Sequence, residues 1–418
     1  MSTDVHALLG RARGAARRLA RLSAEARAAA LEAVALAIEA RAAEILAANA
    51  EDVAAAEGLS GALVDRLRLD AGRVAAMVRA VREVKGQPDP LAARREVGVG
   101  RSGIRVTRRR VPLGVVAIVY EARPNVTAEC AALTLKSGNA VVLRGGKEAR
   151  RSNAAIGAAV QAGLRSAGVP EDAVVLMADS TREDVAALLG AVGMVDLVIP
   201  RGGHGLMRMV DELAKVPVIR HGQGICHVYV DAAADPKMAA EIAFNAKVQR
   251  PGVCNAMETL LVHRSRLQDV LPVLGPRLVE AGVELRADEA ARTTLAAAGV
   301  EAAAATLEDW DTEFLDLVLA VRTVDDLDAA LDHIDAHGTH HTASIVTADE
   351  GTAERFLGAV DASCVLWNAS TRFNDGGELG LGAEMGISTS KMHAYGPMGA
   401  LELTAEKLVV YGQGQTRA

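Results

Sequence analysis

Hydrophobic and polar residues follow different patterns in successive parts of the chain, and these patterns predict its elements. Residues 1 to about 85 form long stretches rich in Ala, Leu, Arg and Glu, which predict helices. From residue 97 to 110 the pattern changes to short apolar–polar alternation around a Gly-Arg-Ser-Gly turn, which predicts a β-hairpin. We therefore expect a helical region that is followed by a hairpin.

Apolar runs then alternate regularly with helical patterns. The predicted strands cover residues 114–120, 140–143, 174–177, 195–199 and 216–219, and helices are predicted between them. Strands that are continuously apolar and alternate with helices indicate a parallel sheet that is covered on both faces. We expect this α/β unit to span residues 1–230. Its architecture commonly binds nucleotides, although a fold alone does not establish a function.

A second α/β unit is predicted over residues 231–390. It contains a helix from residue 235 to about 248 and strands at 259–262, 317–321, 344–347 and 364–367. The Gly-rich segment 368–390 predicts a long irregular loop, which in a compact domain usually has a function. The remaining segment, 391–418, returns to strand-like composition and could pair with another subunit.

Composition and charge narrow the classes of protein. Half of the 418 residues are apolar and only 2% are aromatic, so the cores must consist of Ala, Val, Leu and Ile. A net charge of −7 argues against a nucleic-acid or anionic-membrane surface. No apolar run approaches the roughly 18 residues that cross a bilayer. The four cysteines show no CxxC spacing, which indicates a reducing cytoplasm and predicts no metal site.

Cys254 is the candidate catalytic residue. It follows Pro251 and Gly252 in a tight turn between a predicted helix and a predicted strand, with Lys247 and Arg250 just upstream. Nearby cations favour the thiolate, which is the nucleophilic form of cysteine. The alternative is a buried structural cysteine. The rest of the chain favours the nucleophile, because it supplies the cofactor side of a thiol-dependent dehydrogenase.

Two loops with glycines are candidate cofactor sites, because each follows a predicted strand and precedes a predicted helix. The first loop is Arg144, Gly145, Gly146 and Lys147, and the second contains Gly202 and Gly203. Backbone N–H groups at such positions face anions, and two loops at neighbouring strand ends support each other. Neither loop is a P-loop or a GxGxxG motif. A tight turn with solvated charges is the alternative for the first.

Polar residues after two further strands are candidate substrate contacts. Arg123 and Asn125 follow the strand at 114–120, whereas Arg220 and His221 lie at the junction of the two units, where ligands commonly bind. The Asn125 amide could donate to an oxyanion or cap the next helix. His221 could instead be a histidine of the core.

Several of these stretches together resemble the gamma-glutamyl phosphate reductase family of the aldehyde dehydrogenase superfamily. The stretches are residues 114–120, 123–127, 137–146, 252–255, 368–373 and 380–384. The resemblance spans nearly the whole chain in collinear order. It implies an aldehyde dehydrogenase-like fold with two parallel-sheet α/β domains, one for the cofactor and one for catalysis. It also implies a small β oligomerisation element, made of a hairpin at about 96–111 and the C-terminal segment.

The resemblance also implies a reaction. Members of the family reduce L-glutamyl 5-phosphate to L-glutamate 5-semialdehyde with NADPH and release phosphate, in cytoplasmic proline biosynthesis. Cys254 matches the nucleophile that forms a thioester, with its own backbone N–H and Asn125 as oxyanion donors. Glu313 resembles the carboxylate that holds the nicotinamide-side ribose. Arg144 and Lys147 favour NADP over NAD. A homo-oligomer and a contact with glutamate 5-kinase are expected.

One departure from hydrolytic aldehyde dehydrogenases is informative. Those enzymes have a Glu-Leu-Gly-Gly turn whose Glu activates water, and this chain has Arg220-His221-Gly222-Gln223 at the matching distance from Cys254. Without that base, which is worth roughly 10²–10⁴-fold in rate, the thioester waits for phosphate or hydride. Arg220 could help to seat the phosphate.

Substrate choice is assigned to the Gly-rich loop and the residues before it. Ser370, Thr371 and Arg372 are the expected contacts of the substrate there. Two alternatives stay open: another acylating dehydrogenase that uses CoA or phosphate, and a non-catalytic protein on the same fold. A requirement for phosphate rather than CoA separates the first alternative from the leading interpretation.

Overall fold

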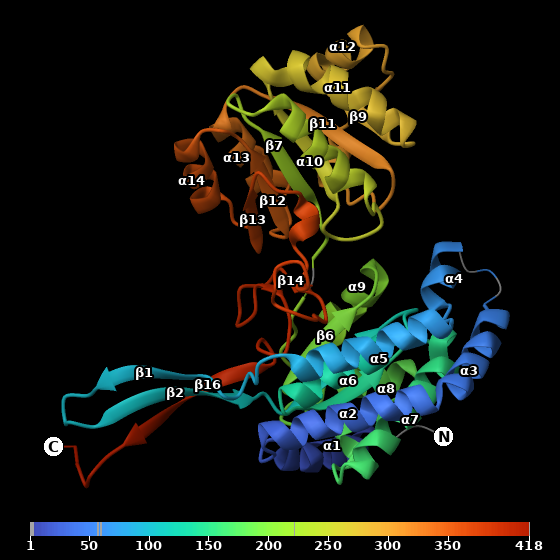
Figure 1. The fold of residues 1–418 in the computed structure, drawn as a ribbon, viewed down its shortest axis with the longest axis vertical. Helices are drawn as coiled ribbons and strands as arrows, with labels where there is room; N and C mark the ends of the chain where they lie inside the picture. The colour runs from blue at the N-terminus through green and yellow to red at the C-terminus, as the bar shows by residue number, and fades with distance from the viewer. Residues whose placement is uncertain (1–3, 57, 59–60, 221, 418) are drawn as a thin grey trace.

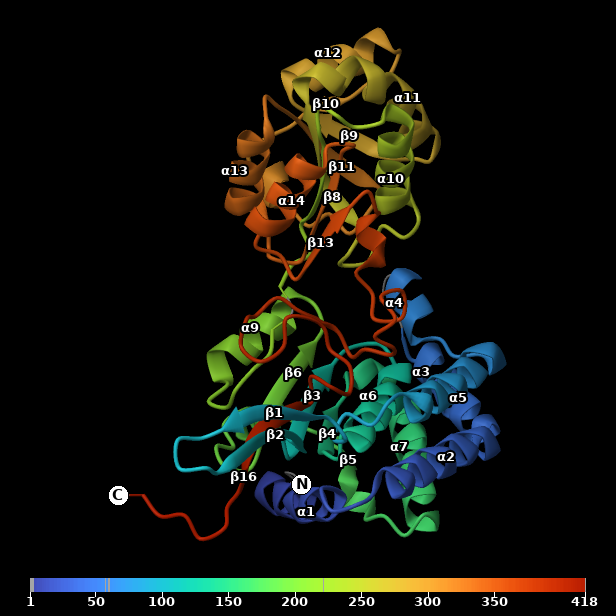
Figure 2. The same ribbon diagram turned by 60° about the vertical axis from the view of Figure 1, so that its left-hand side comes forward.

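The computed structural model describes residues 4–56, 58, 61–220 and 222–417. The chain forms two α/β lobes, one above the other, and a three-stranded arm that projects from the lower lobe (Figures 1 and 2). The lower lobe contains the chain up to α9 (His204–Leu213), and the upper lobe contains the chain from β7 (Cys226–Val230) to β13 (Cys364–Trp367). The predicted fold class is confirmed.

Helices occupy the N-terminal region, as its composition predicts. They are α1 (Val5–Leu19), α2 (Ala24–Ala40), α3 (Ala42–Ala54), α4 (Gly61–Leu67) and α5 (Ala71–Gly86). The side chains of Asp4, Ser23 and Asp70 accept backbone N–H groups at the starts of α1, α2 and α5. These caps satisfy donors that a helix start leaves unpaired, so the sequence fixes where these helices begin.

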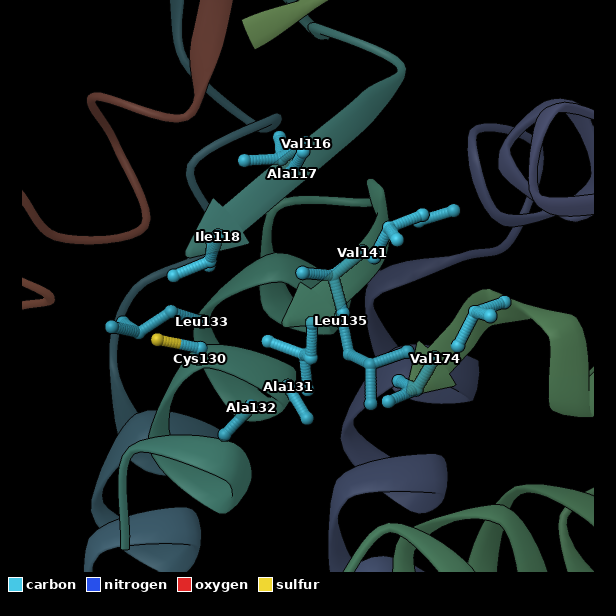
Figure 3. Packing of buried hydrophobic residues seen from close by; sticks show 14 of the residues in the cluster. Val116, Ala117, Ile118, Cys130, Ala131, Ala132, Leu133, Leu135, Val141 and Val174 are labelled. Carbon is cyan, nitrogen blue, oxygen red and sulfur yellow. The ribbon is translucent and has the colours of Figure 1, made fainter. Parts of the chain in front are cut away.

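The sheet of the lower lobe has four parallel strands in the order β5-β4-β3-β6. The strands are β3 (Val115–Tyr120), β4 (Ala140–Arg144), β5 (Val174–Leu176) and β6 (Leu197–Arg201). The connecting helices are α6 (Asn125–Lys136), α7 (Arg150–Ser166), α8 (Arg182–Leu189) and α9. Figure 3 shows Ile118 of β3 close to Leu133 of α6, and both are buried. Small and branched apolar residues therefore fill this core almost without aromatic rings.

The predicted strand at 216–219 is wrong. Val218 forms only an isolated bridge with Val198 at the edge of β6. Pro217 has no backbone N–H, so this segment cannot continue a regular hydrogen-bonded ladder.

The sheet of the upper lobe has seven parallel strands in the order β10-β9-β11-β8-β7-β12-β13. The strands not yet given are β8 (Met257–His263), β9 (Glu284–Ala287), β10 (Ala303–Ala304), β11 (Val318–Val324) and β12 (Thr342–Val346). The helices are α10 (Pro236–Val248), α11 (Leu267–Glu280), α12 (Glu289–Ala297), α13 (Leu327–His337) and α14 (Glu350–Ala359). Because β7 pairs with β8 and β12, this sheet begins at residue 226, and the predicted boundary at 230 lies too late.

The chain after β13 returns to the lower lobe. Met385, Ala394, Met398 and Leu403 are buried in the core of that lobe, on either side of a short ladder between β14 (Ile387–Ser388) and β15 (Gly396–Pro397). The predicted upper unit therefore also ends too late at residue 390. Two passages of the chain connect the lobes, one before β7 and one after β13 (Figure 1).

The arm is an antiparallel sheet of β1 (Arg94–Val99), β2 (Arg105–Pro112) and β16 (Thr404–Tyr411), with β2 in the middle. The predicted hairpin and the predicted C-terminal strand are thus confirmed, and they pair with each other. Val97, Val99, Leu408 and Val410 remain exposed on the arm.

Candidate active site

A cavity of about 420 Å³ lies where the two lobes and the returning C-terminal segment meet, and Cys254 lines it. The lower lobe contributes the ends of β3 and β6, and the upper lobe contributes the turn after α10 and the loop before β11. The returning segment adds Arg372, Asp375 and Glu384. Such a position between domains is a common place for a ligand.

The turn that presents Cys254 is held from two sides. The Cys226 thiol donates to the Cys254 carbonyl oxygen over 3.1 Å, and the Asn255 amide donates to the carbonyl oxygen of Asn374 over 3.0 Å. Gly224 lies so close that a Cβ there would be 1.9 Å from the Cys254 carbonyl oxygen. A glycine is therefore required at 224, and the backbone of Cys254 is fixed in place.

Burial, followed by the nearby Glu313 carboxylate, raises the pKa of the Cys254 thiol to about 11. Arg201 acts in the opposite direction, but the overall shift is upward. The resting thiol therefore does not have the lowered pKa that upstream cations would give it. Lys247 is instead fully buried, with its Nζ 2.5 Å from a carboxylate oxygen of Glu258. The resting thiol keeps its proton until something in the cleft removes it.

Glu313 lies in the cavity, as expected for a residue on the cofactor side. Its Oε1 accepts the Gly224 backbone N–H over 2.8 Å, which places the carboxylate beside the turn of Cys254.

Five arginine side chains line the cavity wall, beside four carboxylates. The arginines are Arg66, Arg123, Arg201, Arg250 and Arg372. Across the described part of the chain, Arg66, Arg123 and Arg250 form no ion pair. Burial, followed by the neighbouring Arg201, lowers the pKa of Arg123. Clustered cations without carboxylate partners favour a ligand with more than one negative group.

Sequence reasoning identified only two of these arginines, Arg123 and Arg372. Arg201 stands just after the predicted strand at 195–199 and just before Gly202 and Gly203. This position at a strand end was the feature of the sequence that could have identified it. The guanidinium of Arg201 donates to the Met385 carbonyl oxygen, and a Cβ at Gly386 would collide with it. Only the fold brings these distant segments together.

Acidic residues complete the cavity wall. Burial, followed by the neighbouring Asp375, raises the pKa of Glu384 to about 7. Glu121 accepts the Gly203 backbone N–H over 2.8 Å at the start of α9. Neither Glu384 nor Glu121 was identified as a site residue from the sequence.

Several expected substrate contacts do not line the cavity. The Arg220 Nε lies 2.6 Å from an Asp211 carboxylate oxygen on the surface. The Asn125 amide donates to Glu129 on its own helix over 2.8 Å and makes no cap. Ser370 and Thr371 are buried, and the Ser370 hydroxyl oxygen accepts the backbone N–H of Arg372. His221 lies outside the described residues.

The two glycine loops differ in their relation to the cavity. Gly202 and Gly203 line it, whereas residues 144–147 do not. A Cβ at Gly145 would lie 2.2 Å from the Asn153 amide nitrogen, and one at Gly146 would lie 1.9 Å from a Glu148 oxygen. Local packing therefore accounts for the glycines of the first loop.

The cationic residues of the first loop remain available to a ligand. Arg144 donates from Nε to the hydroxyl oxygen of Ser180 over 3.2 Å, and Lys147 is exposed at the start of a short 3₁₀ helix (Lys147–Ala149). At the second loop, the Gly203 N–H already binds an anionic oxygen, that of Glu121. This set of donors fits the phosphate groups of a dinucleotide.

Among the described residues, His, Cys, Asp and Glu nowhere gather in threes in a geometry that could hold a metal ion. The helices of the same residues include none with the length and hydropathy needed to cross a bilayer.

Two α/β lobes with a cysteine in the cleft between them define the class of this protein. The model of the aldehyde dehydrogenase family matches residues 1–311. A gamma-glutamyl phosphate reductase of Symbiobacterium thermophilum is 54% identical over 99% of this chain and 100% of its own. Another, of Anaeromyxobacter sp. (strain K), is 52% identical over 89% of this chain and 88% of its own. The chain belongs to the gamma-glutamyl phosphate reductase family of aldehyde dehydrogenases, so the predicted resemblance is confirmed.

Solved structures agree with this assignment. The crystal structure of gamma-glutamyl phosphate reductase from Thermotoga maritima is 41% identical and superposes with a TM-score of 0.95 over 100% of both chains. An acetylating aldehyde dehydrogenase from Geobacillus thermoglucosidasius has a TM-score of 0.69 at 18% identity, over 99% of this chain and 98% of its own, and shares the fold.

Proposed function

We propose that this protein reduces L-glutamyl 5-phosphate to L-glutamate 5-semialdehyde with NADPH, releases phosphate, and thereby serves proline biosynthesis. The observation that supports this most is the position of Cys254 in a cleft whose wall carries arginines without carboxylate partners. The names of the relatives at 52–54% identity point to the same reaction.

Substrate binding falls to the arginines in this proposal. An acyl phosphate of glutamate carries a phosphate and a carboxylate, and guanidinium groups bind both in a planar, two-point manner. Arg123 and Arg372 remain our candidates for these contacts, and Arg201 and Arg250 join them because they line the same cavity. Arg220, in contrast, does not take part.

The covalent step forms a thioester on Cys254. The Cys254 sulfur attacks the acyl carbon, the bond from that carbon to the phosphate oxygen breaks, and phosphate leaves with the bonding electrons. Glu384 accepts the thiol proton, because a pKa of about 7 allows it to gain and lose a proton near neutral pH. The backbone N–H of Cys254 stabilises the negative charge that develops on the acyl oxygen.

The second half of the reaction releases the aldehyde. When NADPH is bound, it supplies the hydride that the thioester carbon needs for reduction. The Cys254 sulfur then departs as the carbonyl group of the aldehyde forms. The position at which hydrolytic relatives place their base holds Arg220, so water has no activator there.

We assign the cofactor contacts as follows. Arg144 and Lys147, at the end of β4, take the adenosine side and its 2′-phosphate, with Gly145 and Gly146 shaping that turn. Gly202 and Gly203 take the pyrophosphate, and Glu313 takes the nicotinamide-side ribose. The lower lobe is thus the cofactor-binding domain and the upper lobe the catalytic domain.

The arm of β1, β2 and β16 is the proposed oligomerisation element, and its exposed apolar residues suit a contact with a second copy. Location in the cytoplasm and contact with glutamate 5-kinase complete the proposal.

An anaerobic steady-state assay of semialdehyde oxidation tests this function. NAD and NADP are compared, and phosphate and CoA are each varied. The proposal requires a dependence on phosphate, a preference for NADP, and little free glutamate when phosphate is absent. Turnover that needs CoA, or glutamate formation without phosphate, would contradict it.

A further inference from the structure

The position of Glu313 depends on the loop that precedes β11. The Glu313 carboxylate accepts the Gly224 N–H over 2.8 Å and lines the cavity that contains Cys254. Together with Arg201 and Glu384, it is one of the charged groups that act on the Cys254 thiol. A shift of this loop would therefore change both the wall of the cavity and the electrostatics of the nucleophile.

This loop contains a residue in an intrinsically unfavourable backbone conformation. Leu315 has a φ of +53° although it is not a glycine, which places it in the left-handed region that L-residues rarely adopt. Its carbonyl oxygen lies close to the Cys254 turn, since a Cβ at Gly252 would be 3.6 Å from it. Such a conformation persists only where surrounding contacts enforce it.

Glu258 supplies one of these contacts from beneath the cavity. It points from β8 into the interior, where its Oε1 accepts the Leu315 N–H over 3.1 Å. Its other oxygen, Oε2, lies 2.5 Å from the Nζ of Lys247 in the last turn of α10. Both side chains are almost completely buried, at 0% and 1% exposure.

A stability role alone does not account for this pair. Buried ion pairs can often be replaced by well-packed apolar residues without loss of stability. The feature that apolar residues would lack is the Oε1 acceptor for Leu315. Lys247 fixes the Glu258 carboxylate through the opposite oxygen, and its ammonium lies 5.9 Å from the centre of the Phe314 ring in the same loop.

We propose that Glu258, whose other oxygen is paired with Lys247, is a positioning residue that holds the Glu313 loop against the Cys254 turn through the hydrogen bond from Leu315. The role of the loop in NADPH binding rests on the proposed function, whereas its effect on the Cys254 thiol does not.

Two double variants separate the acceptor from the charges. K247M/E258Q removes both charges and keeps an oxygen that can accept the Leu315 N–H. K247M/E258M removes both charges and that acceptor, with a side chain of nearly the same shape. Any difference between the two therefore reports the hydrogen bond to Leu315.

Two measurements report whether the Glu313 loop keeps its position. The first is the rate of Cys254 alkylation by iodoacetamide as a function of pH, with the labelled cysteine identified by peptide mass spectrometry. In K247M/E258M we expect the midpoint to fall by roughly half to one pH unit, because a displaced Glu313 no longer opposes the thiolate. The second is the equilibrium Kd of NADPH from its fluorescence. We expect it to rise about tenfold, the effect of losing one hydrogen bond at a buried site.

K247M/E258Q should keep both properties close to those of the wild type. T347V serves as a control for general loss of stability, because it removes a buried hydrogen bond to Asp231 in the same sheet without touching the loop. It should leave both properties unchanged.

The outcomes distinguish the positioning of the loop beside Cys254 from the role of Glu313 in NADPH binding. A shifted alkylation profile with an unchanged Kd supports the positioning role and counts against the cofactor role of Glu313. Equal behaviour of the two double variants overturns the positioning role. If K247M/E258M does not fold, hydrogen–deuterium exchange of the wild-type Leu315 amide decides, since rapid exchange there would overturn the proposal.

Discussion

The Cys226 thiol donates a hydrogen bond to the carbonyl oxygen of Cys254 over 3.1 Å. This contact joins the first residue of β7 to the turn that presents Cys254 to the cavity. Because β7 is the strand through which the chain enters the upper lobe, the contact fixes Cys254 relative to the connection between the lobes.

Cys226→Ala removes this donor and leaves a small void. We expect kcat to fall several-fold and stability to fall by about 1–2 kcal/mol. Cys226→Ser keeps a donor of similar size and should restore most of kcat. The check is steady-state kinetics together with urea unfolding of both variants. Equal kcat in the Ala and Ser variants would show that the hydrogen bond has no catalytic consequence.

Gly224→Ala should be far more damaging than its size suggests. Its Cβ would lie 1.9 Å from the Cys254 carbonyl oxygen and 2.8 Å from the Cys254 Cα, so the backbone of the nucleophile must move. Since displacements of about 1 Å can cost roughly 10²-fold in rate, we expect a loss of that order in kcat/KM.

Gly252→Ala is the matched control for this change. It lies in the turn of Cys254 itself, two residues before that cysteine, and the nearest neighbour of its added Cβ would be 3.6 Å away, an ordinary contact distance. A loss in Gly252→Ala as large as that in Gly224→Ala would rule out the steric explanation.

Arg123 and Arg220 make a second informative pair. Arg123→Met removes an unpaired cation from the cavity and should raise KM for phosphate in the oxidative direction about tenfold or more, the value of one charge-assisted contact. Arg220→Met removes an exposed partner of Asp211 and should change KM less than about twofold. A larger rise in KM for phosphate in Arg220→Met than in Arg123→Met would assign phosphate binding to Arg220.

Glu384→Gln tests the proposed proton acceptor. Because burial and Asp375 raise the pKa of Glu384 to about 7, the wild-type kcat/KM should rise with pH through that value as the carboxylate forms. The glutamine variant should lose this rise and retain NADPH binding. A rise that persists unchanged would assign the titration to another group.

The buried neutral histidines His227 and His333 make a contribution to stability that is lost as pH falls below about 6.5. Burial lowers the pKa of His227 from 6.5 to about 4 and that of His333 to about 2. The unfolded chain therefore binds more protons than the folded chain between these values and 6.5, so acid favours unfolding. His337 and Arg322, which lie beside His333, act in the same direction.

His227→Asn keeps a donor for the Ile225 carbonyl oxygen and cannot titrate. Urea unfolding between pH 7 and 5 should show a slope that is smaller by up to about 1.4 kcal/mol per pH unit. His6→Asn, on an exposed histidine of α1, is the control and should keep the wild-type slope. An unchanged slope in His227→Asn would assign the acid sensitivity elsewhere.

The sequence predicted the elements well where apolar periodicity decides them. The buried strands β3 and β4 read as continuous apolar runs, and the hairpin read as alternation around a turn. The segment around Val218 was apolar too, but Pro217 prevents a regular ladder. The assignment of β7 to the second sheet was not predictable, because a strand at the junction of two units can join either sheet.

The residues that line the cavity were predicted where they stand in one short motif, as at Cys254. They were missed where separate segments converge, as with Arg66, Arg201 and Glu384. Asn125 and Arg220 show the opposite error. Both follow apolar segments at plausible positions, but each has a nearer carboxylate partner, Glu129 and Asp211 respectively, that local sequence does not reveal.

The return of the chain into the lower lobe has a mechanical consequence. The chain crosses between the lobes twice, so a single proteolytic cut in either crossing leaves the lobes joined by the other. Any bending of one lobe relative to the other must turn about an axis that passes through both crossings. A protein truncated after Trp367 would lose Met385 and Leu403 from the lower core and with them part of its solubility. Neither lobe is therefore expected to survive as an independent fragment cut at the end of β13.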